Sequence, residues 1–184
     1  MRVEIASTWL ELVDGDITAQ EVACVVNAAN SRLAGGGGVD GAIHRAAGPT
    51  LMEETRRRYP EGCPTGSAVI SSAGELAAEY VIHAVGPVWN GGQSGEAEQL
   101  AAAYRRALEL AHEQACASIA LPALSTGAYG YPVDLAARVA LGTSIDFVSE
   151  HSLPSLVRFV LFGGGAYGAF AAALEELIAA RQDY

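Results

Sequence analysis

Apolar and polar positions alternate along the chain with two periods, one typical of strands and one typical of helices. Short apolar or alternating runs predict six strands, at residues 3–13, 22–27, 67–71, 80–85, 118–124 and 156–162. Apolar positions that recur every three to four residues predict four helices, at residues 39–58, 96–116, 133–150 and 166–181. The pattern therefore predicts strands interleaved with helices along most of the chain.

This interleaving favours an α/β fold in which helices cover both faces of a layered sheet. The runs "SIALPAL" and "VRFVLF" are almost continuously apolar, which is typical of strands buried on both faces. The chain has 184 residues, and a chain of this length buries roughly 70% of its unfolded surface. We expect one domain over residues 1–184.

The charge of the chain narrows the classes of partner. The formal net charge is −10 at pH 7, and the sequence contains no lysine. Binding to nucleic acid regardless of sequence needs a basic face that neutralises phosphates, so no nucleic-acid partner is expected. The one basic run, at residues 56–58, falls late in a predicted helix, where cations suit the helix dipole.

Hydropathy and cysteine usage indicate a location. No apolar stretch approaches the length of a membrane-spanning helix, and the first residues lack the plan of a signal peptide. The three cysteines are odd in number and widely spaced, which favours reduced thiols over a disulfide framework. We therefore expect no membrane association and a cytoplasmic protein.

Three glycine-rich segments follow predicted strands and precede predicted helices. They are "NAANSRLAGGGGVDG" from residue 27, "STGAYGYP" from residue 125 and "GGGAYG" from residue 163. Layered α/β sheets bind ligands at the carboxyl ends of their strands, and helix N-termini offer unpaired N–H groups. The sequence thus predicts a phosphate cradle made of backbone amides, without basic side chains.

Common cofactor and metal motifs do not explain these segments. The pattern G-x-G-x-x-G occurs twice, but neither copy has the strand and acid that a dinucleotide site needs, and a P-loop would need a lysine. The stretch "HEQAC" offers only His112 and Cys116 as metal ligands, which do not make a site. His83, inside an apolar strand, is expected to be a hydrogen-bonded core residue. We expect no metal and no cofactor.

Single residues near these segments have ordinary structural interpretations when each is taken alone. Asp40 at a helix start is typical of an N-cap, Asn30 and Asp16 are typical of turns, and Phe162 at a strand end is typical of a core position. Together, however, these residues place acids, an amide and an aromatic ring at the ligand-binding ends of buried strands.

The motifs, taken in order, resemble those of a macrodomain of the MacroD type. They are "GDIT", "NAAN", "GGGGVDGAIHRAAG", "CPTG", "HAVGPVW" and "STGAYGYP", and they cover nearly the whole chain. The resemblance implies a three-layer α/β/α sandwich with a mixed, mostly parallel central sheet. It also implies an ADP-ribose ligand, and an enzyme that removes mono-ADP-ribose from acidic side chains of proteins and deacetylates O-acetyl-ADP-ribose.

The resemblance implies a role for each matching residue. Asp16, with Ile17 beside it, would accept a hydrogen bond from the adenine amino group, and Phe162 would stack on the adenine. The diphosphate would lie between a first loop containing Gly38 and Val39 and a second loop formed by Ser125, Thr126, Gly127, Ala128 and Tyr129. Gly163 to Gly165 stand where related sequences carry acidic or polar residues, so we expect an open adenine edge.

At the distal ribose, the resemblance makes Asn30 and Asp40 the catalytic residues. Asn30 would hold the ribose hydroxyls, Asp40 would act on the adjacent water, and His44 and Tyr129 would line the same end. The alternative is a non-catalytic module that reads ADP-ribose and leaves it intact. The expected partners are ADP-ribose and ADP-ribosylated proteins, and the oligomeric state stays open.

Overall fold

The computed structural model of the chain describes residues 1–182, so the last two residues of the predicted domain lie outside the described part. The strands are β1 (Arg2–Ile5), β2 (Thr8–Asp14), β3 (Cys24–Ala28), β4 (Ala68–Ser72), β5 (Tyr80–Ala84), β6 (Ser118–Leu121) and β7 (Leu156–Leu161). The helices are the 3₁₀ turn η1 (Ile17–Ala19), α1 (Gly38–Ala47), α2 (Thr50–Arg58), α3 (Glu96–Glu113), α4 (Val133–Glu150) and α5 (Gly164–Gln182).

The strands form one sheet in the order β1-β2-β7-β6-β3-β5-β4. Strands β2, β7, β6, β3 and β5 run parallel, while β1 and β4 pair antiparallel with their neighbours at the two edges. The carboxyl ends of the five parallel strands therefore meet at one edge of the sheet, where α/β folds place their ligands. The expected mixed, mostly parallel sheet is confirmed.

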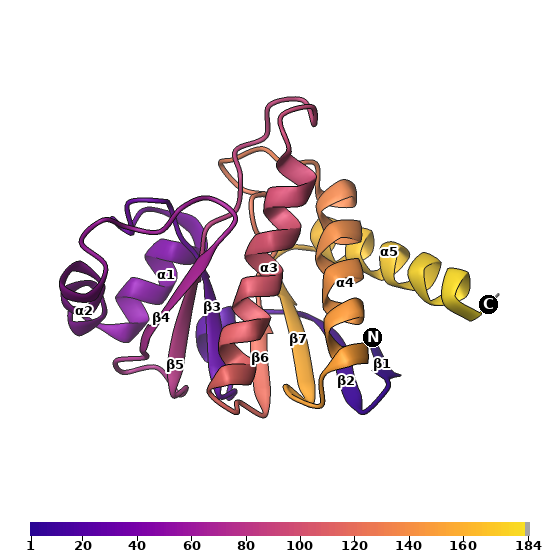
Figure 1. Ribbon diagram of the computed structural model, residues 1–184, viewed down its shortest axis with the longest axis horizontal. Helices are drawn as coiled ribbons and strands as arrows, with labels where there is room; N and C mark the ends of the chain where they lie inside the picture. The colour runs from indigo at the N-terminus through magenta and orange to yellow at the C-terminus, as the bar shows by residue number, and fades with distance from the viewer. Residues whose placement is uncertain (183–184) are drawn as a thin grey trace.

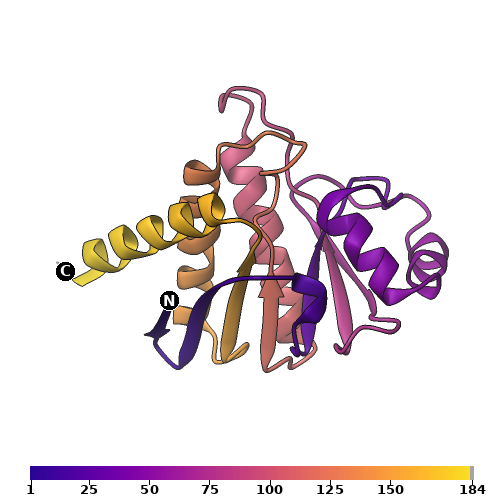
Figure 2. The same ribbon diagram turned by 180° about the vertical axis from the view of Figure 1, so that it is seen from behind.

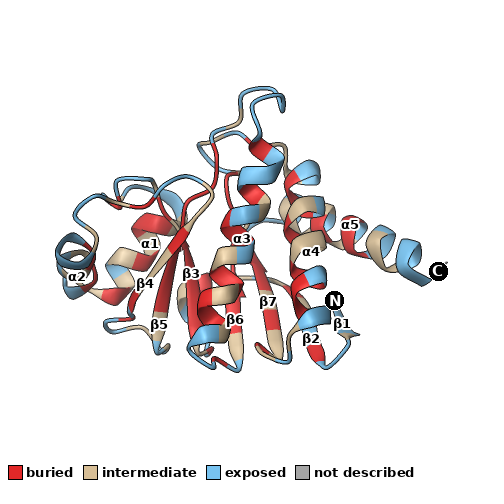
Figure 3. Ribbon diagram, viewed as in Figure 1, coloured by how far each residue is buried: buried red, intermediate tan, exposed pale blue. Residues whose placement is uncertain are grey.

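Helices cover both faces of the sheet, which confirms the expected three layers (Figure 1). Helices α3, α4 and α5 contribute Tyr104, Ile145 and Phe170 to the larger buried cluster on one face. Helix α1 packs on the other face, seen in Figure 2, through Ile43 and Ala47. The central strands β3, β5, β6 and β7 are mostly buried, as Figure 3 shows. Both faces of a strand then need apolar side chains, which explains the continuous apolar runs.

Two predicted elements are each divided in the structure. The strand expected at residues 3–13 is a hairpin of β1 and β2, which turns at Ala6 with a positive φ of 52°. The helix expected at residues 39–58 is two helices, because Gly48 adopts a φ of +83° and Pro49 follows it. The apolar pattern continues across both breaks, because β1 and β2, like α1 and α2, each pack apolar residues against the core. The pattern alone therefore did not reveal where each element ends.

The boundaries near the third glycine segment also differ from the prediction. Helix α5 begins at Gly164 rather than at residue 166, so most of "GGGAYG" lies inside the helix and only Gly163 precedes it. Helix α3 ends at Glu113 and β6 ends at Leu121, each three residues earlier than expected. In residues 1–182, no helix is both long and apolar enough to cross a membrane.

Candidate active site

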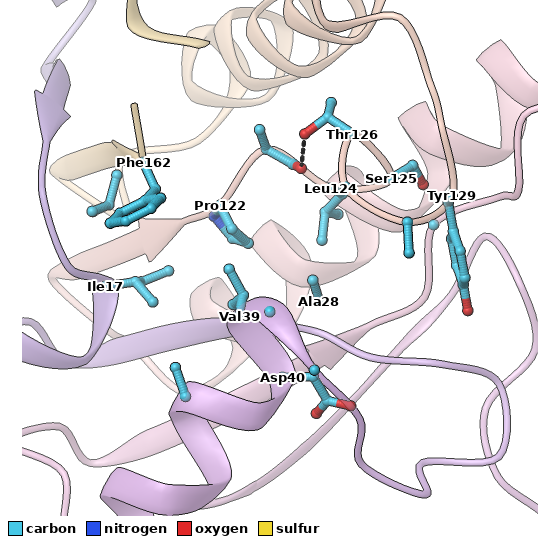
Figure 4. Close-up of a pocket in the computed structure, with 18 of the residues that line it drawn as sticks. Ile17, Ala28, Val39, Asp40, Pro122, Leu124, Ser125, Thr126, Tyr129 and Phe162 are labelled. Atoms are coloured by element: carbon cyan, nitrogen blue, oxygen red, sulfur yellow. Dashed lines mark hydrogen bonds between the residues drawn. The ribbon is translucent and has the colours of Figure 1, made fainter. Parts of the chain in front are cut away.

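A pocket of about 760 Å³ opens at the carboxyl ends of the parallel strands. Its walls come from the residues that follow β2, β3, β5, β6 and β7, together with the start of α1. Figure 4 shows Phe162 and Ile17 at one end of it, Tyr129 at the other, and Asp40 below Val39. All of the predicted site residues except His44 line this pocket.

No arginine or histidine lines the pocket among the described residues. An anion would instead meet backbone N–H groups, above all at the start of α1. The N-cap of this helix is Gly37, which has no side chain to satisfy the first amides. Unpaired amides at a helix N-terminus, together with the helix dipole, favour a bound anion.

The glycine residues 35–38, which we call the first loop, are needed for two different reasons. Gly35 and Gly38 have positive φ values of 77° and 55°, which favour glycine. Gly37 has an ordinary φ of −94°, and a Cβ added there would meet no atom within 4 Å. A side chain on Gly37 would therefore fit the fold but would take up space in the pocket that this residue lines.

Asn30 braces the first loop with its side chain. Its Nδ2 donates to the carbonyl of Gly35 at 2.9 Å, and its Oδ1 accepts from the amide of Ala34 at 3.1 Å. The interpretation of Asn30 as a turn residue is therefore confirmed. The amide group keeps one N–H and one lone pair for a ligand, so its predicted contact with the distal ribose stays a prediction.

Asp40 is not the N-cap that its position suggested; the cap is Gly37, and Asp40 is the third residue of α1. The residue is only 6% exposed. Its Oδ1 accepts from Nδ2 of Asn27 at 2.8 Å and lies 3.0 Å from Nδ1 of His44. Two contacts at Oδ1 hold the carboxylate in one orientation, with Oδ2 on the side of Gly36.

His44 does not line the pocket as expected, because it follows Asp40 by one helical turn and lies behind it. Its Nδ1 is 2.9 Å from the backbone carbonyl of Asp40 as well as 3.0 Å from the carboxylate. The hydrogen bond to Asp40 raises the pKa of His44, and partial burial opposes this effect. His44 can therefore act on a ligand only through Asp40.

Sequence reasoning missed Asn27, which ends the apolar part of β3 and is completely buried. Its Nδ2 contacts both Asp40 and Nδ1 of His83, the latter at 3.1 Å. His83 is 1% exposed and was correctly expected to be a hydrogen-bonded core residue. The available signal was a polar side chain within the run "VVNAA", since a buried amide must find partners.

The second loop, residues 125–129, carries strain at its first residue. Ser125 has a positive φ of 68°, and its buried Oγ has no hydrogen-bond partner in the described part of the chain. Its Oγ also occupies the place where a Cβ on Gly86 would stand, so a side chain at residue 86 would force Ser125 to move. A strained backbone and an unpaired hydroxyl are typical of a ligand-binding position.

A neighbouring loop supports the second loop from outside. The amide of Trp89 donates to the carbonyl of Tyr129 at 2.9 Å, and its ring lies 4.6 Å from that of Tyr131. The buried carboxylate of Glu96 in turn accepts from the amides of Asn90, Gly92 and Ser94 at 2.9, 2.8 and 2.6 Å. The second loop is thus held on this side by a segment that Glu96 itself stabilises.

The opposite end of the pocket is open to solvent. Phe162 is 90% exposed, which excludes the interpretation of this residue as part of the core. Asp16 accepts from the amide and the hydroxyl of Thr18 at 2.8 and 2.7 Å through Oδ1, which confirms its turn role. These bonds, that of the hydroxyl first, lower the pKa of Asp16. Its carboxylate therefore stays ionised at the edge of the pocket.

Neither the cysteines nor the remaining histidines contribute to this pocket. Cys24, Cys63 and Cys116 are buried, and none forms a disulfide within residues 1–182. His112 bonds the carbonyl of Leu153 at 3.0 Å. The described residues contain no group of three or more His, Cys, Asp or Glu side chains that could hold a metal ion.

Sequence comparison shows which known proteins the chain is similar to. The family model of the macro domain matches residues 26–140. An O-acetyl-ADP-ribose deacetylase of Salmonella typhimurium is 54% identical over 155 residues, which cover 83% of this chain and 87% of that protein. The region that the family model matches includes the first loop, α1 and the second loop.

Solved structures extend the likeness to the fold. A macrodomain of Oceanobacillus iheyensis with ADP superposes with a TM-score of 0.92 at 44% identity, covering 97% of this chain and 96% of that one. A Trypanosoma brucei macrodomain in complex with ADP-ribose has a TM-score of 0.83 at 38% identity, covering 90% of this chain and 68% of that one. The chain belongs to the macro domain family.

Proposed function

We propose that the chain binds ADP-ribose in this pocket and hydrolyses an ester at its distal ribose. The substrates would be proteins that carry mono-ADP-ribose on acidic side chains, and O-acetyl-ADP-ribose. The observation that carries the proposal is the buried carboxylate of Asp40, held by Asn27 and His44 beside the first loop, where a reader would need no reactive group. The named activity of the Salmonella relative supports it.

The shape and chemistry of the pocket support one orientation of the ligand. The adenine would stack on Phe162 with its amino group near Asp16, since these residues form the open end. The diphosphate would lie between the first and second loops, where amides at the start of α1 offer donors without basic side chains. The distal ribose would then reach Asn30 and Asp40.

Hydrolysis at that ribose needs a positioned water and a proton for the leaving oxygen. In the deacetylation, the water oxygen bonds to the acyl carbon, the bond from that carbon to the ribose oxygen breaks, and the ribose oxygen takes up a proton. Asp40 would orient or deprotonate the water through Oδ2, because Oδ1 is held by Asn27 and His44. Asn30 would hold the adjacent ribose hydroxyl as a neutral donor. The diphosphate of the ligand would assist Asp40 in activating the water.

The proposed partners are ADP-ribose and proteins modified with it. The pocket is lined without a basic side chain, which supports a small anionic ligand over a nucleic acid. The three buried thiols, none in a disulfide within the described residues, support the expected cytoplasmic location.

The test compares three substrates with the same preparation of the protein. We expect release of ADP-ribose from a protein modified on glutamate and release of acetate from O-acetyl-ADP-ribose, but little release from a protein modified on serine. Tight binding of ADP-ribose by calorimetry, without release from any of the three, would contradict the hydrolase. That result would establish the reader alternative instead.

A further inference from the structure

A row of buried polar side chains crosses the α1 face of the sheet behind Asp40. It consists of Ser71 on β4, His83 on β5 and Asn27 on β3, and we call it the polar row; each member is at most 1% exposed. Asn27 and His83 are direct register partners on neighbouring parallel strands, so their side chains lie next to each other. The row ends at Asp40 on α1, 2.8 Å from Asn27.

Only one arrangement of hydrogens satisfies every contact in the row. The carboxylate of Asp40 can only accept when ionised, so Nδ2 of Asn27 donates one hydrogen to it. The second hydrogen on Nδ2 then points to Nδ1 of His83 at 3.1 Å, which must accept. His83 is therefore the neutral imidazole with its hydrogen on Nε2.

The far side of His83 agrees with this assignment. Nε2 lies 2.9 Å from Oγ of Ser71, which accepts the imidazole hydrogen. The hydroxyl of Ser71 passes its own hydrogen to the carbonyl of Ser72 at 2.9 Å. The alternative tautomer would set a hydrogen on Nδ1 against the amide hydrogens of Asn27, two donors facing each other in a buried site.

Burial of the polar row lowers the stability of the fold relative to apolar side chains. This loss argues against a merely structural role for the row. Its neighbours on the same face, Val25 and Val81, are fully buried and apolar. Oδ1 of Asn27 is buried without a partner in residues 1–182, and the amide keeps this orientation because Nδ2 donates its two hydrogens to Asp40 and His83. An unpaired buried amide oxygen costs stability, which an apolar side chain would avoid.

We propose that His83 is a positioning residue for the hydrolysis. As the Nε2–H tautomer it accepts from Asn27, holds that amide in the one orientation that donates to Asp40, and so keeps Oδ2 of Asp40 directed to the first loop. Ser71 fixes the tautomer by accepting from Nε2. The effect on turnover rests on the proposed function, whereas the arrangement of hydrogens does not.

The test uses three variants of the full chain. His83→Phe keeps a ring but removes the acceptor; His83→Gln restores an acceptor for Asn27 and a donor for Ser71. Val81→Ala is the matched control, because it weakens packing on the same strand and face but removes no hydrogen-bonding group of the polar row, although Val81 pairs in register with Ser71. Kinetics with O-acetyl-ADP-ribose, ADP-ribose calorimetry and thermal unfolding are measured for each.

We expect His83→Phe to lower kcat by about 10²-fold, the effect of a small misplacement of a reacting group, with ADP-ribose affinity unchanged. His83→Gln should recover most of that loss, and Val81→Ala should keep the wild-type kcat even if it unfolds at lower temperature. A wild-type kcat in folded His83→Phe would overturn the proposal. If His83→Phe does not fold, a loss of kcat in Ser71→Ala takes its place as the deciding result.

Nitrogen-15 NMR of the histidine rings gives an answer that needs no turnover. We expect His83 as the Nε2–H tautomer, and a shift of the Asp40 carboxyl carbon signal in His83→Phe but not in Val81→Ala. The Nδ1–H tautomer would overturn the proposal. A wild-type protein with no hydrolase activity would refute the proposed function alone, and these two spectroscopic results would still decide whether His83 positions Asp40.

Discussion

The two ends of the pocket are built in opposite ways. At the open end, Phe162 is 90% exposed, and within the described residues the side chain of Asp16 bonds only to its neighbour Thr18. At the buried end, Asp40 is 6% exposed and is tied through Asn27 to strands β3 and β5. A weakly held end suits recognition of a flat group that covers it on binding, whereas an end fixed in advance suits a reaction, because a reacting group must not move.

This contrast separates affinity from turnover. Substitutions at the open end should change how tightly ADP-ribose binds and leave the chemical step alone. Substitutions at the buried end should change the chemical step and leave the binding of plain ADP-ribose nearly unchanged. The predictions below test that separation, beginning with the largest expected effect.

At the buried end, removal of the Asp40 carboxylate should cause the largest loss of turnover. We expect Asp40→Ala to lower turnover of O-acetyl-ADP-ribose by roughly 10²–10⁴-fold, the range for one positioned acid–base group. Calorimetry should show ADP-ribose affinity close to that of the wild type. The control is Asp134→Ala, an exposed acid in the first turn of α4. Near-normal turnover in folded Asp40→Ala would leave this residue a purely structural partner of Asn27.

At the open end, removal of the Phe162 ring should lower the affinity for ADP-ribose. Base–aromatic stacking contributes about 1–3 kcal/mol, so Phe162→Ala should weaken ADP-ribose binding roughly 5–150-fold in calorimetry. The value of kcat at saturating substrate should stay constant, and Phe162→Tyr should bind like the wild type. A fall in kcat without a change in affinity would place Phe162 in the chemistry and break the comparison.

Asp16 should show a smaller effect of the same kind. Asp16→Asn keeps an oxygen for the bonds from Thr18 and loses the negative charge, so it isolates the contact with the adenine amino group. We expect a loss of about 1.5 kcal/mol in binding, the lower range for a charge-assisted hydrogen bond, because the residue is exposed. Asp16→Ala should lose more, since it also removes the cap of η1. Unchanged affinity in both variants would remove Asp16 from the site.

Between pH 6.5 and 4.5, acid should lower the stability of the folded protein through the buried His83. Burial lowers the pKa of His83 from its ordinary 6.5 to about 4, so the native protein leaves it neutral while the unfolded chain binds a proton. The contribution of His83 to the free energy of unfolding is complete above pH 6.5. It is lost as the pH falls toward 4, by about 1.4 kcal/mol per pH unit. His44 acts in the opposite direction, because its raised pKa adds stability at acid pH that is lost as the pH rises through that value.

Denaturant unfolding of wild type and His83→Gln at pH 6.5, 5.5 and 4.5 separates these two histidines. His44 is present in both proteins, so the difference between their unfolding free energies reports His83. As the pH falls, the wild type should lose more unfolding free energy than His83→Gln. A constant difference would mean that His83 takes up its proton in the folded protein.

Chelation should have the smallest effect, which is none. The backbone amides of the two loops replace a metal as the partner of the diphosphate in our proposal. Turnover of O-acetyl-ADP-ribose should be the same before and after exhaustive treatment with a chelator. Loss of activity that zinc or magnesium restores would contradict the proposal and require metal ligands at the buried end.

The sequence by itself determined the layered α/β class and the place of the site. Short apolar runs predicted the buried strands, and the glycine segments after them predicted loops at their carboxyl ends; the structure has these strands and the first two loops, while most of the third segment lies inside α5. This worked because strand burial and glycine-rich turns are local properties of the chain. The same local signal could not show that residues 3–13 turn at Ala6, or that one predicted helix ends at Gly48.

Only the tertiary structure decided which polar groups meet. Asn27 and His83 are 56 residues apart and become partners through the register of β3 with β5. By contrast, His44 lies outside the pocket because it follows Asp40 by one helical turn, and Gly37 is the N-cap because α1 begins at Gly38. Periodicity records how deeply a residue is buried, but the identity of its buried partner depends on strand order and register, which long-range packing sets.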